Sequence, residues 1–449
     1  MAKKDAKKSE QKFHTDVEEF IPYAAHFDEN TVITKNGELM QTVKITGFAY
    51  ETIKEGSEGV SGLRDLIRKA IKDNVKTNDF AFWIHTLRRK RDISVSGDYK
   101  HEFCRNLHKK WSEHNDWQEQ YVNELYVSVL IEGEPLSIKN VKHLFQSLSV
   151  NTEYNNRKQV LFERAEKLNS TVEKMLADLQ QYGARRLGIF KNNEAAYCSE
   201  IMGFVSKIMN LRQQDIELLP ADLSTILPTH TAVFQYNTIQ VQGETGKHYG
   251  AVFSIKEFHE LNLHEIEKFL QLPVQFIVSE SFDFVDKDTA TESFRDQAKI
   301  YSLSGDKYMP EISGLKEVME EEKDESTAFG QHQIVFTVLE DSVKKMQEAI
   351  SQTVDKLRDL GVVFIREDLF MEYCYWSQMP GNFDFIKRQN YIPSSRIGGY
   401  ASLYNFPAGK MKGNLWGDAV TVFRTGDDTP YFFNFHYEKN GHTSIIGPF

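Results

Sequence analysis

The chain has 449 residues, of which 40% are hydrophobic and 27% charged, the composition of an ordinary folded protein with room for two or three domains. Its formal net charge of −11 argues against the chain as a whole acting as a nucleic-acid clamp. The three cysteines, Cys104, Cys198 and Cys374, are too widely spaced for a zinc site or a disulfide framework, and no apolar run approaches the ~20 residues that cross a bilayer. These properties favour a reduced, cytoplasmic protein without a transmembrane segment.

The N-terminal part begins with residues 1–12, a lysine-rich stretch that we predict to be a disordered basic tail, because it has no apolar core to bury. A β-hairpin is expected next, with Thr31 to Lys35 and Glu38 to Phe48 as its strands. The dipeptide Asn36-Gly37 between them is the strongest short hairpin signal in a sequence.

An alternation of helices and strands follows the hairpin. Leu63 to Ile71 has helical periodicity, Phe80 to Leu87 is an apolar strand, Phe103 to Trp111 a second helix and Tyr126 to Ile131 a buried strand. The basic run Arg88 to Arg91 leaves the first of these strands, and we interpret it as an exposed strand end, since charge runs are usually solvated.

A single long helix is predicted from Thr152 to Gly183, with an apolar stripe along one side and Gly183 as its C-cap. Its length is unusual for a globular helix, so we expect it to join two parts of the molecule. We place an N-terminal α+β module at residues 13–183, ending in this helix.

A second module, residues 184–388, returns to a similar layout and suggests a duplicated arrangement, although the residues themselves show no repeat. Gly243 to Lys247 is predicted to be a hairpin turn and not a phosphate-binding loop, because Val241 and His248 occupy positions where such a loop needs glycine and Ser or Thr. The predicted elements of this module are strands at Arg186 to Phe190, Thr231 to Gln240, His248 to Ile255, Val274 to Phe284, Gln333 to Leu339 and Val362 to Arg366, and helices at Ala195 to Leu211, Thr289 to Ser302 and Ser342 to Leu360.

The last segment, residues 389–449, has a different texture, rich in glycine, proline and aromatic residues. Its end predicts two strands, Tyr431 to His436 and His442 to Ile446, joined by a turn at Asn440-Gly441. Gly447 would be the first glycine of a P-loop, G-x-x-x-x-G-K-[ST], whose backbone N–H groups and lysine converge on phosphates. The second glycine, the lysine and the hydroxyl residue would fall beyond Phe449, so we expect an incomplete nucleotide site.

Seven motifs, in one order and spanning nearly the whole chain, resemble the CagE/TrbE/VirB family, the large ATPases of bacterial type IV secretion and conjugation machines. They are Phe20-Ile-Pro-Tyr23, Thr31-Val-Ile-Thr-Lys35, Gln378-Met-Pro-Gly-Asn-Phe383, Asn405-Phe-Pro-Ala-Gly-Lys410, Gly413-Asn-Leu-Trp-Gly417, Thr429-Pro-Tyr-Phe-Phe-Asn-Phe-His436 and Gly441-His-Thr-Ser-Ile-Ile-Gly-Pro448. The resemblance covers the family's N-terminal and central regions and reaches the start of the Walker A loop.

The expected fold is therefore α/β (α+β): two mixed strand-helix modules joined by a long helix, followed by the first strands of a RecA-like P-loop domain that is truncated in this chain. The resemblance implies a subunit peripheral to the cytoplasmic face of the inner membrane, which contacts other type IV secretion subunits and forms homo-oligomers. It also implies ATP and Mg²⁺ as cofactors of the full-length family, but none in this chain.

We expect the chain to be the assembly and docking portion of such an ATPase, with no catalytic or metal-binding residue assigned and no activity alone. Two alternatives stay open: half of a split ATPase completed by a separate motor domain, and a nucleic-acid-binding module, which the net charge does not favour. His26 and Asp28 are too few ligands for a metal site and favour a capping role. Arg388 and Lys410 could reach a phosphate held by a neighbouring subunit, but most surface cations do not.

Overall fold

The structure of the protein is a computed structural model, and it describes residues 17–47, 71, 79–91, 100–114, 120–133, 152–210, 214–243, 246–257, 269–304, 328–397, 405, 408–415, 417–425, 429–436, 441–444 and 446–447. The predicted basic tail and, apart from Ile71, the predicted helix at residues 63–71 lie outside these residues. No helix among the described residues is both long and apolar enough to cross a membrane.

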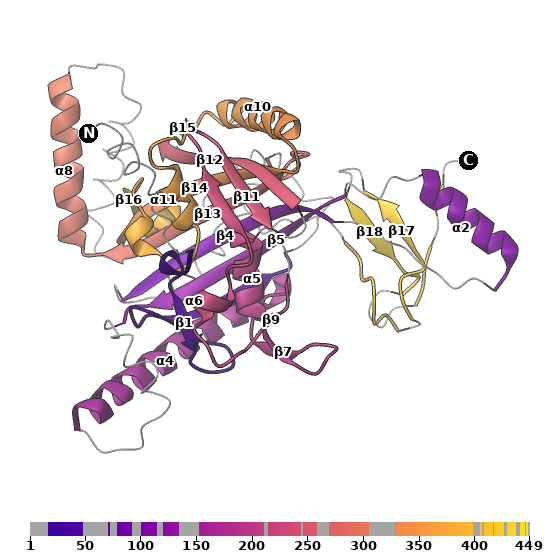
Figure 1. Ribbon diagram of the computed structural model, residues 1–449, viewed down its shortest axis with the longest axis horizontal. Helices are drawn as coiled ribbons and strands as arrows, with labels where there is room; N and C mark the ends of the chain where they lie inside the picture. Colours follow the sequence, from indigo (N-terminus) through magenta and orange to yellow (C-terminus); the bar gives the residue numbers. More distant parts are fainter. Residues whose placement is uncertain are drawn as a thin grey trace, which may run out of the picture.

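Thirteen of the described strands form one large antiparallel sheet (Figure 1). Its strands follow the order β1-β2-β3-β5-β4-β13-β14-β12-β11-β10, while β6 pairs with β3, β15 with β12 and β16 with β14. The sheet therefore runs without a break through both predicted modules. The prediction of a mixed fold of strands and helices is confirmed, whereas the RecA-like character of the last segment and the domain boundaries stay predictions.

The strand order reads the same from both ends, because the sheet is built from two units with the same succession of elements. The first unit consists of β1 (Tyr23–His26), β2 (Val32–Thr34), β3 (Leu39–Ile45), β4 (Phe80–Arg91), α2 (Glu102–His114), β5 (Gln120–Ile131), α4 (Thr152–Asp178) and β6 (Arg185–Arg186). The second consists of β10 (Thr231–Phe234), β11 (Ile239–Gly243), β12 (Gly246–Glu257), β13 (Gln275–Val285), α8 (Lys287–Ser304), β14 (Phe329–Glu340), α10 (Val343–Asp359) and β15 (Val363–Arg366). The topology thus has the duplicated layout that the sequence suggested.

The two units meet where β4 pairs with β13, in an antiparallel register that runs from Ala81 opposite Asp283 to Arg88 opposite Phe276. In the first unit α2 lies between β4 and β5 in the sequence, and in the second unit α8 lies between β13 and β14. In Figure 1 these two helices, α8 and α2, lie at opposite ends of the longest axis of the molecule.

The remaining elements join or cover the two units. A three-stranded sheet is formed by β7 (Ile189–Lys191), β8 (Tyr197–Ser199) and β9 (Ile216–Glu217). The other elements are α5 (Glu200–Met209), α6 (Leu223–Ile226), α11 (Met371–Trp376), β16 (Asn390–Pro393), and the 3-10 helices η1 (Val17–Phe20), η2 (Gln180–Tyr182), η3 (Phe383–Phe385) and η4 (Ser394–Arg396).

Helices cover both faces of the large sheet, as the alternation of side chains along β13 shows. Phe276 and Val278 pack with α10, and Phe282 and Phe284 belong to the cluster with α4, so these two helices share one face. Ile277 points to the other face, where α5 and α11 supply the core. The result is a three-layer arrangement with the sheet in the middle.

The predicted long helix is confirmed as α4, which ends at Asp178 before a short 3-10 turn closed by Gly183 in the left-handed conformation. Its apolar stripe is buried, with Leu168 and Val172 fully covered. Because this stripe packs against β3 and β5, the helix completes the first unit as well as leading to the second.

The Asn36-Gly37 hairpin is confirmed, with Val32 opposite Met40, and so is the turn after Gly243, which pairs with Gly246. The single strand predicted from Thr231 to Gln240 is wrong. This segment is the hairpin of β10 and β11, whose turn is closed by a hydrogen bond from Gln235 N to Thr238 O. Asn237 is the turn residue that the apolar pattern concealed.

One further helix prediction needs correction, and another is confirmed. The helix predicted from Ala195 begins at Glu200, because the residues before it form β8, and Ser199 caps the helix by accepting from Met202 N. The helix predicted around Phe103 is confirmed as α2; Phe103 is 75% and Leu107 57% exposed, whereas Trp111 is partly buried.

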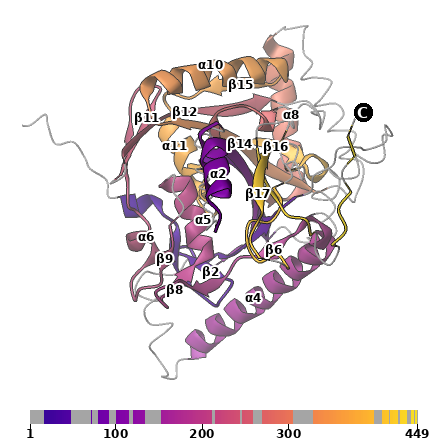
Figure 2. The same ribbon diagram turned by 90° about the vertical axis from the view of Figure 1, so that its right-hand side faces the viewer.

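The last segment contributes a separate two-stranded sheet, β17 (Thr421–Arg424) and β18 (Pro430–Phe433), which lies beside α2 (Figures 1 and 2). The predicted partner of β18, a strand at His442–Ile446, is wrong, because residues 441–444 and 446 have no strand geometry. Instead, β18 pairs with the preceding strand, β17, with Val422 opposite Phe432. Asn440 of the predicted turn lies outside the described residues.

Candidate functional site

The motif Gln378–Phe383 and the N-terminal motif Phe20–Tyr23 lie against each other, although they are more than 350 positions apart in the sequence. Asn382 Nδ2 donates to the carbonyl oxygens of both Phe20 and Trp376, each at 2.9 Å. The rings of Phe20 and Trp376 stack with centroids 4.9 Å apart. Two motifs that are far apart in the sequence therefore form one structural contact.

Buried polar groups fix the Gln378–Phe383 motif to the centre of the sheet. His85 Nε2 on β4 donates to the Gln378 carbonyl at 2.7 Å, and Thr337 on β14 donates to the Gln378 side chain at 2.9 Å. Trp83 Nε1 donates to the Ser377 carbonyl at 3.1 Å. Burial lowers the pKa of His85 to about 4, although its bond to Gln378 opposes that shift. The imidazole is thus neutral at pH 7. Because the motif is hydrogen-bonded to β4 of the first unit and to β14 of the second, it links the two units.

The basic run Arg88–Arg91 is not the exposed strand end that the sequence predicted. Arg88 is only 2% exposed and donates to the Leu272 carbonyl at 2.6 Å. Lys90 pairs with the buried carboxylate of Glu340 at 3.0 Å. The run continues β4, and the second unit supplies acceptors that a local charge pattern cannot reveal.

A second polar cluster lies where β3, β4, β5 and α5 converge on Glu124. Its carboxylate accepts from Lys44, Arg89 and Lys207 at 2.9–3.0 Å, and Lys207 contacts both carboxylate oxygens. Lys207 also donates to the hydroxyl of Tyr126 at 2.8 Å. Sequence reasoning missed this cluster because its members come from four elements and none has a local signature.

The charges of this cluster perturb one another. Burial would raise the pKa of Glu124, but Lys207, Arg89 and Lys44 outweigh burial and hold that pKa well below its usual range. Burial lowers the pKa of Lys207 to about 8, helped by the neighbouring Arg89 and Lys44 and opposed by Glu124. Three cations on one carboxylate leave the cluster with surplus positive charge.

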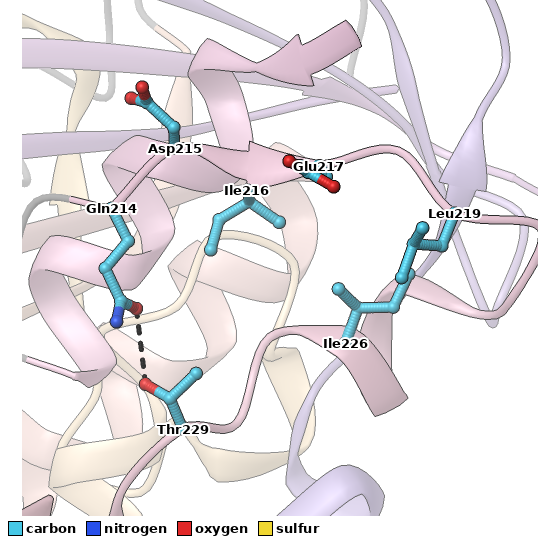
Figure 3. A pocket seen from close by; sticks show the side chains of 7 residues that line it. All are labelled: Gln214, Asp215, Ile216, Glu217, Leu219, Ile226 and Thr229. Atoms are coloured by element: carbon cyan, nitrogen blue, oxygen red, sulfur yellow. Dashed lines mark hydrogen bonds between the residues drawn. The ribbon is translucent and has the colours of Figure 1, made fainter. Parts of the chain in front are cut away.

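An open groove of about 730 Å³ lies between β9 and the segment after α6 (Figure 3). Ile216, Leu219 and Ile226 give it an apolar floor, while Thr229 donates to Gln214 at 3.2 Å across one end. Its size is that of ligand pockets in general. Nothing in its lining selects a particular ligand chemistry.

The β17–β18 sheet is apolar on both faces. Val422 and Phe432 are buried on one face, with Trp111 of α2 packed against them. On the other face the ring of Phe433 contacts Phe423 at 5.2 Å and Phe435 at 5.1 Å. Phe423 is 49% and Phe435 44% exposed, so this aromatic face, formed by Phe423, Phe433 and Phe435, is half open to solvent.

Gly447, the predicted first glycine of the P-loop, lies in exposed chain, and a Cβ placed on it would meet no atom within 4 Å. Its role in nucleotide binding stays a prediction. Arg388 is held by a bidentate pair with the buried carboxylate of Glu367, at 2.9 and 3.1 Å. Lys410 is exposed, as the sequence suggested.

His26 and Asp28 have local structural contacts. His26 Nδ1 donates to the Asp28 carbonyl at 3.1 Å, and Ser199 donates its hydroxyl to His26 Nε2 at 2.7 Å. The Asp28 carboxylate accepts from Asn30 N at 2.8 Å. Because Ser199 is the N-cap of α5, His26 links β1 to that helix.

Comparison with known proteins supports the resemblance in both modules. Residues 185–388 match the CagE, TrbE, VirB family, component of type IV transporter system. Residues 30–136 match the N-terminal domain of the type IV secretion system ATPase VirB4/TrbE. The resemblance to the CagE/TrbE/VirB family over the N-terminal and central regions is thus confirmed.

Curated relatives align along almost the whole chain. The type IV secretion system protein virB4 of Bartonella henselae is 26% identical over 432 residues, which are 96% of this chain and 54% of that protein. Protein virB4 of Agrobacterium tumefaciens is 23% identical over 434 residues, and the virB4 protein of Brucella abortus 22% over 445 residues, each with 53% of the relative covered. The chain spans about half the length of the curated relatives it matches.

Proposed function

We propose that this chain, similar to the CagE/TrbE/VirB family over its N-terminal and central regions, is the assembly and docking portion of a type IV secretion ATPase. It would work at the cytosolic face of the inner membrane, in contact with other subunits of the machine and with further copies of itself. The relatives support the assignment to type IV secretion. The docking role, the location and the partners are the proposed part.

The aromatic face of the β17–β18 sheet is the observation that carries the docking role. A two-stranded sheet is marginally stable by itself, and among the described residues the face toward Trp111 is the covered one. Exposed aromatic residues grouped on one surface mark a place for a protein partner. Because relatives extend for about as many residues again, we assign the ATP-hydrolysing portion as the occupant of this face.

ATP and Mg²⁺ are implied by the family and would be held by that other portion. Phosphoryl transfer needs a P-loop lysine, a hydroxyl ligand for Mg²⁺ and an acidic metal ligand. Gly447, the nucleotide-site candidate of this chain, supplies none of these groups. We therefore derive no catalytic step from this chain.

The test is binding between this chain and the P-loop portion of the same secretion system, measured by titration calorimetry. The double variant Phe423→Ser, Phe433→Ser should bind at least tenfold more weakly than the unsubstituted chain. Leu369→Ser, which changes an equally apolar residue that is 82% exposed elsewhere, is the matched control and should bind normally. Equal binding by all three proteins would refute the docking face, and magnesium-dependent ATP turnover by the chain alone would refute the division of labour.

The first alternative, a split ATPase, is distinguished by the same reagents: mixing the chain with a separately encoded motor domain would then restore ATP turnover that neither part has alone. The second alternative, a nucleic-acid-binding module, gains no support from the basic run. Arg88, Arg89 and Lys90 are engaged with protein groups and are not offered to phosphates.

A further inference from the structure

A small cavity of about 110 Å³ lies beside the Glu124 cluster, under the first turns of α5. Three cationic side chains line it: Lys44 from β3, Arg185 from β6 and Lys207 from α5. Leu187, Phe190 and Phe204 form apolar parts of its wall. We propose that this cavity is a binding site for a compact oxyanion, an inorganic phosphate or the phosphoryl end of a larger ligand.

The charges around the cavity favour an anion. Glu200 and Asp215 also line it, and Arg185 neutralises Glu200 through two bonds of 2.8 Å. Glu124, behind the wall, faces three cations, of which Lys207 alone contacts both of its oxygens. With Arg89 included, four cations meet three carboxylates, in a chain whose net charge is −11.

The cluster also keeps unused hydrogen-bonding capacity. Arg89 Nε is buried and has no hydrogen-bond partner among the residues that the structure describes. Among the described residues Lys44 has one hydrogen-bond acceptor, Glu124, for its three N–H groups, and its side chain is 30% exposed, so it can turn toward a ligand. Burial, with Arg89 and Lys44, lowers the pKa of Lys207 to about 8, so an added anion would stabilise its charged form.

The size of the cavity limits the ligand. A water molecule takes about 30 Å³ in the liquid, so 110 Å³ holds three or four waters or one tetrahedral oxyanion. Sites that enclose a drug-sized molecule are roughly 300 Å³ or more, so a nucleoside would have to remain outside. The cavity therefore selects the phosphoryl group and not the body of a larger ligand.

The experiment titrates the full chain with inorganic phosphate, and separately with AMP, at constant ionic strength, using sodium chloride as the reference salt. Lys44→Gln should weaken phosphate binding at least tenfold, while Lys344→Gln, which removes an equal charge from a lysine that is 87% exposed on α10, should leave it within twofold. Thermal unfolding of both variants checks that they are folded. If AMP binds as tightly as phosphate, the ligand of the cavity is the phosphoryl end of a larger molecule. If phosphate binds and AMP does not, the ligand is the free ion.

A second variant keeps the test decisive if Lys44→Gln is unstable. Glu124→Gln removes the internal carboxylate that competes with phosphate for the three cations, so this variant should bind phosphate more tightly. Phosphate should also raise the thermal unfolding temperature of this variant. The proposal is overturned if chloride reproduces the effect of phosphate and AMP, or if Lys44→Gln and Lys344→Gln bind phosphate equally. Neither result bears on the docking face, which lies on different elements.

Discussion

Phe20 and Trp376 stack with ring centroids 4.9 Å apart and an angle of 9° between their planes. This contact joins the 3-10 helix η1 at the start of the described chain to α11 near the end of the second unit. Trp376 is 2% exposed and lies in the same core cluster as residues of β4 and α5. The pair therefore joins the segment before the first unit to the helix that follows the second unit.

Trp376→Ala should lower the free energy of unfolding by about 3–5 kcal/mol, because it leaves a large cavity in this core. A double-mutant cycle with Phe20→Leu and Trp376→Leu should give a coupling energy of about 0.5–1.5 kcal/mol, the range for aromatic pairs. Urea unfolding of Trp376→Ala and of the four proteins of the cycle measures both quantities. Additive single effects would mean that the stacking itself contributes nothing.

Gly381→Ala should be more destabilising than Gly413→Ala, although both glycines have positive φ, 92° and 69°. The backbone strain of a non-glycine residue there is roughly 1–2 kcal/mol in each case. At Gly381 the added Cβ also meets Leu130 at 3.2 Å and Thr34 at 3.3 Å inside the core, while at Gly413 the nearest neighbour is 3.9 Å away. Thermal unfolding compares the stability of the two variants. Equal losses of stability would mean that the contacts of the added Cβ at position 381 cost nothing.

Asp283→Asn should stabilise the protein, and more so at pH 8 than at pH 5. Burial, and then Glu132, raises the pKa of Asp283 to about 7 from its ordinary 3.8. The folded state thus holds a proton that the unfolded state releases. The contribution of Asp283 to the free energy of unfolding is therefore fully present below about pH 4 and is lost as pH rises through 7. Unfolding free energies at both pH values check this, and a pH-independent difference would argue against the shift.

Arg88→Ala should cost about 2–4 kcal/mol of stability, because it removes a buried guanidinium and leaves the Leu272 carbonyl and the Asn123 amide oxygen without this donor. Arg358→Ala provides the comparison: that side chain is 70% exposed, so its loss should change stability by no more than about 0.5 kcal/mol. Chemical denaturation measures the loss of stability in both variants. Equal losses would mean that Arg88 is exposed, and a larger loss in Arg88→Ala would confirm that it is buried.

Local sequence patterns determined most of the secondary structure. Asn36-Gly37 fixed a hairpin through its turn chemistry, and the apolar run from Phe80 fixed β4. Ser342 and the periodicity after it fixed α10, where the serine accepts from Lys345 N as a cap. The motifs Phe20–Tyr23 and Gln378–Phe383 likewise indicated the family without revealing that they touch.

Only the tertiary structure decided how these elements combine. The pairing of β4 with β13 joins segments nearly 200 positions apart, and a period of two residues gives a strand its faces but not its neighbour. The same limit hid the burial of Arg88 and the convergence of Lys44, Arg89 and Lys207 on Glu124, because partners from distant elements leave no trace in a local window. Sequence thus specified the elements and their apolar faces, while long-range packing specified the sheet order and the charged cavity.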